Sequence, residues 1–319
     1  MSVEHLRELD GLPAFTFPHA GEESGRPLPD AGSVAWRVAI HSWESEETWA
    51  EAFDRFLKSV DTSRVRALIV GCWGESYDTS SAVPVERLAA AKDLLPALRA
   101  VFVGDMESEE SEISWIQQSD VTPVLDAYPE LRVLGVRGGS GLAFPAVRHE
   151  RLRKLYVESG GLPAGVVRGI GASELAALEH LELWLGVPEY GGDAEAADLA
   201  PLLSGTRFPA LRHLGLCNAE IQDEIAAAVA SSPLVARLES LDLSMGVLTD
   251  EGAAALLDGQ PLTHLSSLDL HHNYLSDPMV RRITDALAPS GVEVDLSSSG
   301  YEDEDELDGE VFRYTAVAE

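Results

Sequence analysis

The chain has 319 residues, of which 54 are acidic and 23 are lysine or arginine, giving a formal net charge of −31. Nucleic acids and anionic membranes bind proteins through cationic side chains that neutralise phosphate, so this charge argues against both kinds of partner. No charged segment followed by an apolar one opens the chain, and no apolar run approaches about 18 residues. We therefore expect a soluble, cytoplasmic protein.

The first predicted region is an arm over residues 1–33, where glycines and prolines interrupt any regular pattern. Its apolar stretch LPAFTF, residues 12–17, is expected to dock on the unit that follows. A first, capping strand is predicted over 36–40. A strongly amphipathic helix follows, with a start signal at Ser45 and apolar residues from Trp49 to Val60.

Five further segments share the spacing L-x-x-L-x-L, with valine or isoleucine at some positions, which is typical of a recurring short strand. They lie at 65–70, 98–103, 131–136, 152–157 and 178–183. An acidic insertion, residues 104–118, separates two of them. Two interpretations remain open for it: Trp115 and Ile116 pack on the next unit, or the insertion overhangs one rim and contributes Glu107, Trp115 and Gln117 to a binding site.

Three segments repeat in register at an interval of about 27 residues, which is typical of a solenoid. They read LRHLGLCNAEIQD at 211–223, LESLDLSMGVLTD at 238–250 and LSSLDLHHNYLSD at 265–277. Helices are predicted after Thr249 and after Ser276, where acidic residues and a first-turn proline follow a capping side chain. A last short strand is predicted over 292–296.

The end of the chain contains an acidic run, residues 301–310, which is expected to stay solvated. Residues 311–317 alternate in polarity and could form a terminal strand that covers the open edge of the sheet.

The pattern L-x-x-L-x-L-x-x-N/C-x-L, matched best by residues 265–275, resembles the leucine-rich repeat family over roughly 34–300. The long, helix-bearing units resemble its ribonuclease-inhibitor-like branch. Residues 112–125 also resemble a segment of uncharacterised bacterial leucine-rich repeat proteins. One departure is clear: only Asn273 fills the asparagine position of the family, where Ala219 and Gly246 stand in the neighbouring units.

Alternation of strand and helix predicts units that stack because none buries its apolar side alone. We expect an α/β, right-handed leucine-rich repeat solenoid with a curved parallel sheet on the concave side and helices on the convex side. Residues 1–33 form the arm, 34–300 about nine to ten units, and 301–319 the acidic end with its possible edge strand.

The leucines at 214/216, 241/243 and 268/270 should face the core, which places the residues between them on the concave side. The outward residues that we predict to bind a partner are Phe102, Arg137, Lys154, Tyr156, Glu158, Glu182, Trp184, Asp242, Asp269 and His271. Asp242, Asp269 and Asp295 should stand in one file at about 5 Å per strand and raise one another's pKa.

Several interpretations of this face stay open. Its polar residues could simply keep the sheet solvated, or bind a polar or basic protein segment. A metal site from Asp242, Asp269, Asp295 and His271 is weaker, because paired histidines adjacent in a strand point to opposite faces. A hydrolase triad lacks a nucleophile-elbow motif, and the glycines at 138–141 and 169–171 fit turns better than phosphate loops.

What the family resemblance implies is binding of a protein or peptide on the concave face. We expect a non-catalytic scaffold without cofactor or metal, and the net charge favours a basic or neutral partner. The alternative is an accessory subunit that presents a substrate to a partner enzyme. Aromatic and arginine side chains anchor protein contacts, so the middle units are expected to hold the partner.

Overall fold

The computed structural model describes residues 3–22, 27–41, 45–297, 305–307 and 310–319, and its main feature there is one long sheet. Twelve strands follow one another in chain order across it, parallel except for the first pair. They are β1 (Glu8–Leu9), β2 (Leu12–Thr16), β3 (Ala35–Val38), β4 (Ala67–Val70), β5 (Ala100–Val103), β6 (Val133–Arg137), β7 (Lys154–Glu158), β8 (His180–Gly186), β9 (His213–Ala219), β10 (Ser240–Asp242), β11 (Ser267–Asp269) and β12 (Glu293–Asp295).

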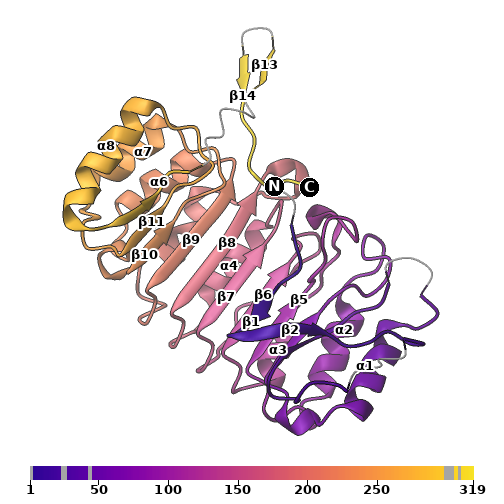
Figure 1. Ribbon diagram of the computed structural model, residues 1–319. Helices are drawn as coiled ribbons and strands as arrows, with labels where there is room; N and C mark the ends of the chain where they lie inside the picture. Colours follow the sequence, from indigo (N-terminus) through magenta and orange to yellow (C-terminus); the bar gives the residue numbers. More distant parts are fainter. Residues whose placement is uncertain (1–2, 23–26, 42–44, 298–304, 308–309) are drawn as a thin grey trace.

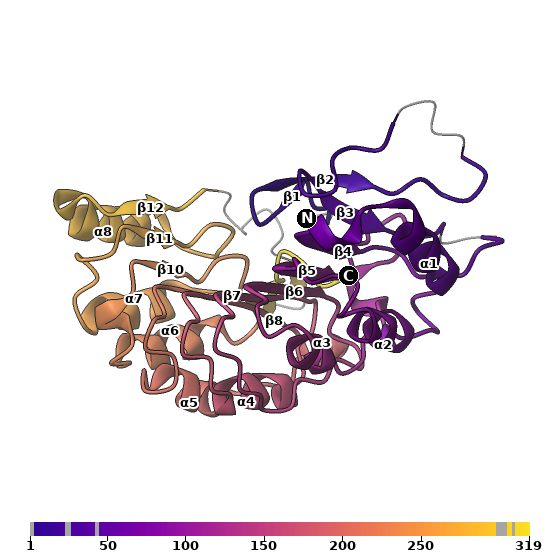
Figure 2. The same ribbon diagram turned by 90° about the horizontal axis from the view of Figure 1, so that it is seen from below.

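Helices connect the strands and cover one side of the sheet, which curves so that the other side is hollow (Figure 2). In the described part of the chain they are α1 (Trp49–Ser59), α2 (Ala82–Ala90), α3 (Thr122–Ala127), α4 (Ala164–Ala172), α5 (Ala200–Leu203), α6 (Gln222–Ala230), α7 (Asp250–Asp258) and α8 (Asp277–Leu287). The result is a mixed α/β repeat architecture with an unclosed, mostly parallel sheet (Figure 1). No helix within the described ranges is long and apolar enough to cross a membrane.

The predicted register of the repeats is confirmed. Leu214, Leu241 and Leu268 are paired on neighbouring strands and buried, and the leucines two positions later are buried as well. Asp242 and Asp269 lie on the opposite face and are half-buried. A slip of one residue would have reversed both sets, so the leucine pattern alone fixes which side chains reach the concave face.

Helix starts follow the capping signals with one correction. Thr249 accepts the amide of Glu251 at the start of α7, and Ser276 accepts that of Met279 at the start of α8, as predicted. The helix expected from Ser45 begins instead at Trp49, because Thr48 and Glu51 form a capping box there. This reciprocal pair satisfies two backbone donors, which a single serine further upstream does not.

Asn273, which matches the asparagine of the repeat pattern in the sequence, bonds to three backbone groups of the turn. It is buried, accepts the amide of Leu248 at 3.1 Å, and donates to the carbonyls of Leu243 and Leu270 at 3.0 and 3.1 Å. In the unit around β9, Gln222 takes a similar place and donates to the carbonyl of Leu216 at 2.8 Å. A hydrogen-bonded turn therefore persists in the unit where Ala219 stands at the asparagine position.

The N-terminal arm docks on the first unit as a strand and then does more. Residues 12–16, expected to pack there, form β2 and pair in parallel with β3. Upstream, residues 3–11, which we call the crossing segment, turn back through β1 and lie over the concave face in front of the middle strands (Figure 1). The turn is made by Asp10 and Gly11, both with positive φ.

The described C-terminal residues do not pair with the edge strand β12, which corrects one prediction. Residues 305–307 (β13) and 310–312 (β14) pair with each other in a separate hairpin that projects from the sheet (Figure 1). Beyond it, Val317 exchanges both backbone hydrogen bonds with the Asn218 side chain, and the Ala316 amide donates to the Met245 carbonyl at 2.9 Å. Hydrogen bonds between the Asn218 side chain on β9 and the backbone of Val317 thus hold the C-terminal residues, in place of the expected strand pairing at the sheet edge.

Candidate functional site

In-register strands arrange the concave side chains in two rows that cross the sheet. One row is Ala14, Ala35, Ala67, Ala100, Val133, Lys154, His180, His213, Ser240, Ser267 and Glu293. The other is Thr16, Arg37, Ile69, Phe102, Gly135, Tyr156, Glu182, Gly215, Asp242, Asp269 and Asp295. The face is therefore largely apolar from β3 to β6 and polar from β7 onward.

The crossing segment covers the apolar half. Leu9 is buried in one cluster with Ala35, Ile69 and Phe102, and Leu6 packs against the same cluster. Phe102, predicted as an exposed anchor, is fully buried. The prediction was wrong because these apolar residues on the concave side need a cover, and the chain supplies its own.

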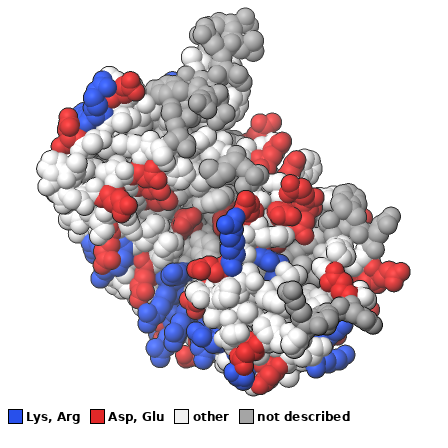
Figure 3. Space-filling view, in the orientation of Figure 1, with Lys and Arg blue, Asp and Glu red and all other residues white. Residues whose placement is uncertain are grey.

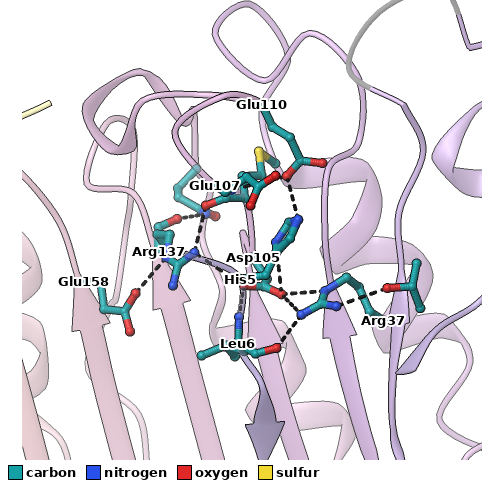
Figure 4. Close-up of polar contacts among 11 residues, drawn as sticks. His5, Leu6, Arg37, Asp105, Glu107, Glu110, Arg137 and Glu158 are labelled. Atoms are coloured by element: carbon teal, nitrogen blue, oxygen red, sulfur yellow. Dashed lines mark hydrogen bonds and ion pairs between the residues drawn. The ribbon is translucent and has the colours of Figure 1, made fainter. Parts of the chain in front are cut away.

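Backbone atoms of the crossing segment are held in a polar clamp formed by His5, Arg37, Asp105 and Arg137 (Figure 4). The Leu6 amide donates to Asp105 Oδ1 at 2.9 Å, and Arg37 Nη2 donates to the Leu6 carbonyl at 2.6 Å. Arg37 Nε also donates to Asp105 Oδ2 at 2.6 Å. The backbone amide and carbonyl of Leu6 are thus both hydrogen-bonded, the amide to Asp105 in the loop after β5 and the carbonyl to Arg37 on the sheet.

The contacts in the clamp favour the charged forms of Asp105 and His5. Burial alone would raise the pKa of Asp105, but His5 and Arg37 beside it hold that pKa below its ordinary value. The Asp105 carboxylate, with Nδ1 of His5 3.6 Å from Oδ2, raises the pKa of His5. Glu110, whose pKa is raised by burial, lies 3.4 Å from the other ring nitrogen of His5.

Arg137 was also predicted as an exposed anchor, and it is buried instead. Its Nε donates to Glu158 at 2.7 Å, its Nη1 donates to the Met106 carbonyl at 2.8 Å, and its guanidinium lies over the Phe102 ring. Burial raises the pKa of Glu158 in spite of this partner. Arg137 therefore joins the clamp to the strand β7 and lies buried between them.

Four of the predicted residues do meet in an open hollow of about 300 Å³ beside the crossing segment, which we call the open groove. It is lined by Lys154, Tyr156, Glu158, His180 and Glu182, with Glu8, Leu9, Asp10 and Val133 along its other wall. Lys154 is exposed, and Tyr156 is half-buried with its ring tilted over Phe102 at 5.7 Å. Acidic side chains lie across the middle of this face and basic ones gather along its lower left edge in Figure 3.

A second polar cluster adjoins the open groove at β8 and β9. His180 and His213 stack at 3.9 Å between ring centroids, and Glu182 Oε2 lies 3.4 Å from His180 Nε2 and 4.0 Å from His213 Nε2. Burial, reinforced by neighbouring His180, lowers the pKa of His213 to about 4. Burial opposes ionisation of Glu182, but hydrogen bonds from His180 and Trp184 lower its pKa.

Trp184 occupies a position between the groove and the C-terminal end. Its indole donates to Glu182 Oε1 at 2.9 Å, and its ring packs against the cluster that contains Cys217, Ala316 and Val317. Trp184, which was predicted as an anchor for a partner, is thus partly covered by the C-terminal residues Ala316 and Val317.

The acidic file has the predicted register: Asp242, Asp269 and Asp295 are direct strand partners. Burial is the main cause that raises the pKa of Asp242, with a contribution from Asp269, whereas hydrogen bonds from Ser297 lower that of Asp295. His271 Nδ1 lies 2.8 Å from Asp269 Oδ1, and this contact raises the pKa of His271. The file is an electronegative strip at the C-terminal half of the face.

The three residues of the predicted rim site are not brought together. Trp115 is exposed and lines a hollow of about 560 Å³ with Gln117 and Tyr190, while Ile113 and Ile116 on either side of it are buried. Glu107 lies apart from this hollow, beside the clamp (Figure 4). The insertion therefore both packs on the sheet and supplies the clamp residue Asp105.

Three groups of side chains have ligand atoms close enough to hold a cation in the described part of the chain. They are His19, Glu22 and His41; His180, Glu182 and His213; and Asp269, His271 and Asp295. The clamp residues His5, Arg37 and Asp105 escaped prediction. The run of apolar outward residues Ala35, Ile69 and Phe102 was the signal that a cover lies over this half of the face.

Among known proteins, the chain is similar to a Bacteroides fragilis protein whose crystal structure was determined as a structural-genomics target. The two share 34% sequence identity over 89% of this chain and 78% of the other, with a TM-score of 0.78. No family model matches the sequence, and no curated protein matches it.

Proposed function

We propose that this chain, which belongs to the same family as the Bacteroides fragilis protein, is a non-catalytic scaffold that binds an extended protein or peptide segment. The binding surface is the concave face of a right-handed leucine-rich repeat solenoid of the ribonuclease-inhibitor-like kind, and the scaffold acts in the cytoplasm. The part of the face available to the partner is the polar half, from β7 to β11.

One observation carries this proposal: the concave face already holds extended backbone. The crossing segment is bound through the amide and carbonyl of Leu6, and its Leu9 side chain enters the apolar cluster. Backbone capture combined with a pocket for alternate side chains is how sheets bind extended peptides of another chain. The open groove begins beside Leu9 and extends across β7 to His180 and Glu182 on β8.

Charge indicates the kind of partner. Glu158, Glu182, Asp242 and Asp269 lie on the open half, against one exposed cation, Lys154, in the lining of the groove. Such a surface attracts a basic segment and orients it before short-range contacts form. Tyr156 offers the aromatic anchor, because its half-buried ring packs against the fully buried ring of Phe102.

Fluorescence anisotropy with labelled synthetic peptides tests the proposal on the full chain. An extended peptide that alternates lysine or arginine with leucine should bind, whereas a peptide of equal length with glutamate in place of the cations should not. We expect Tyr156→Ala to weaken binding about tenfold or more and Asp269→Asn to weaken it less.

The matched control for the charge change is Glu224→Gln on α6, an exposed acid on the convex side. Equal losses from Asp269→Asn and Glu224→Gln would mean that only overall charge attracts the peptide. Binding of neither peptide, or equal binding of both, would overturn the proposal.

A further inference from the structure

His180, Glu182 and His213 bring three metal-ligand side chains together on the concave face. His180 and Glu182 stand two residues apart on β8, so both project to the same side, and His213 on β9 is the direct register partner of His180. Their nearest ligand atoms all lie within 4.8 Å of one another. Register between two strands, rather than chance contact of flexible side chains, produces this convergence.

Neighbouring groups hold the atoms that do not face the centre of the cluster. Ser240 Oγ lies 2.7 Å from His213 Nδ1, and the Trp184 indole donates to Glu182 Oε1 at 2.9 Å. With Nδ1 donating to Ser240, the lone pair of His213 is on Nε2. That nitrogen is buried and makes no hydrogen bond within the described residues. Outer partners of this kind fix the tautomer and orientation of metal-binding histidines.

Space for the carboxylate comes from Gly215, which lies between Glu182 and Asp242 in its row. A Cβ atom at position 215 would approach Glu182 Cγ to 2.7 Å. Glycine at this position therefore lets the Glu182 side chain reach over β9 toward His213. Any other residue would require the Glu182 side chain to shift from this position.

We propose that His180, Glu182 and His213 bind one divalent transition-metal ion, with zinc as the best match to two imidazole nitrogens and one carboxylate oxygen. Zinc–ligand bonds of about 2.0 Å in a tetrahedron place neighbouring donor atoms about 3.3 Å apart. The His180–Glu182 distance of 3.4 Å meets this value, and the His213–Glu182 distance of 4.0 Å needs only a small closure. The stacked rings must also tilt, so that both Nε2 lone pairs point at the ion.

Three protein ligands leave a fourth coordination position open, as in zinc sites where water or substrate occupies that position. Because His180 and Glu182 line the open groove, that position faces the groove beside Lys154 and Tyr156. Water, or a donor group of a bound molecule, would fill it. The metal site stands independently of peptide binding, since its ligands come from the sheet alone.

Titration calorimetry with zinc chloride, on chelator-treated protein from which any polyhistidine tag has been removed, tests the proposal. Cobalt(II) serves as a second probe, because its visible absorption reports a tetrahedral site. We expect one ion per chain. Glu182→Gln and His213→Gln should each weaken zinc binding about 100-fold, and Ser240→Ala, which removes only the outer partner, about 10-fold.

The matched control is His271→Gln in the cluster with Asp269 and Asp295, which should leave zinc affinity unchanged. Circular dichroism of the metal-free variants checks that each one folds. If a ligand variant does not fold, the expected loss of about 10-fold in zinc affinity in Ser240→Ala tests the site instead. Absence of zinc binding, binding that survives Glu182→Gln and His213→Gln, or binding lost in His271→Gln would each overturn the proposal.

Discussion

Leu6 donates its backbone amide to the Asp105 carboxylate at 2.9 Å, across 99 positions of sequence. The contact depends on the main chain of Leu6 and on a carboxylate that is fully buried beneath it. Because Asp105 also pairs with Arg37, removal of the crossing segment would leave a buried ion pair short of one donor. The segment is therefore part of the folded sheet, and its release has a measurable free-energy cost.

The apolar contact of Leu9 is expected to hold the crossing segment more than any other single side chain. Leu9→Ala should destabilise the segment by about 2–3 kcal/mol, since it removes a buried leucine from a packed cluster. Hydrogen exchange should then quicken at residues 5–14 and stay unchanged in β10, which lies outside that cluster. The neighbouring control is Glu8→Ala, an exposed position. Equal acceleration in both variants would contradict the packing argument.

The clamp should weaken as pH rises. Its Asp105 partner raises the pKa of His5 above 6.5, so protonated His5 contributes stability in full below that value and loses it as pH passes the raised pKa. We expect the protection factor of the Leu6 amide, corrected for intrinsic exchange, to fall as pH rises from 6.5 through the raised pKa of His5. His5→Gln should show little change over this range.

Other charges around His5 define the acid side of this profile. Asp105, Glu110 and Arg37 face the ring of His5. The pKa of Asp105 lies below its ordinary 3.8, so the stability from this carboxylate is present above 3.8 and is lost only as pH falls through the lowered value. A Leu6 protection factor that increases toward alkaline pH would refute the assignment.

Asn273 should be the most sensitive polar residue of the C-terminal repeats. Asn273→Ala leaves the Leu248 amide and two carbonyls without their partner in a buried turn, which should cost about 2–3 kcal/mol of the free energy of unfolding. Urea denaturation measures the loss. Asp285→Asn, an exposed change on α8, serves as the control and should stay within about 0.5 kcal/mol of the unchanged chain. A similar small effect at Asn273 would mean that water replaces the side chain.

Peptide binding should depend on salt in proportion to the charge of the acidic file. Ions at about 0.1 M screen exposed charges beyond about 10 Å. Asp242, Asp269 and Asp295 lie on successive strands beyond the groove lining, at about 5 Å per strand, so their attraction should weaken with salt. The cationic peptide should bind more weakly as salt is raised, while an uncharged peptide of equal length should not change. A salt effect that persists in Asp269→Asn combined with Asp295→Asn would assign the attraction to other acids.

The sequence predicts most of this fold because each repeat is locally consistent. Leucine spacing fixes the core side of β9, β10 and β11, and the capping residues Thr249 and Ser276 set the helix starts. The concave position of Tyr156 and Glu182 follows from the same alternation of side chains along a strand. These features depend on neighbours within one or two units, which a pattern records.

What the sequence did not reveal depends on contacts between distant segments. Phe102 and Arg137 occupy concave positions, as predicted, yet both are buried, Phe102 under the crossing segment and Arg137 among its contacts with Met106 and Glu158. Nothing in their own strands encodes these contacts. Trp184 is half covered by the C-terminal residues for the same reason. The charge pairing of Asp105 with two arginines likewise joins three elements, so no local spacing announces it.

The two ends of the sheet differ in what they offer to another chain. At one end the antiparallel pair β1–β2 folds back over the first strands. At the other, β12 is three residues long, carries the exposed acids Glu293 and Asp295, and in the described residues pairs on one side only. Negative charge on a short edge strand discourages the addition of a further strand. Addition of a strand at the β12 end is therefore opposed by charge, and neutralising Glu293 and Asp295 would remove that protection.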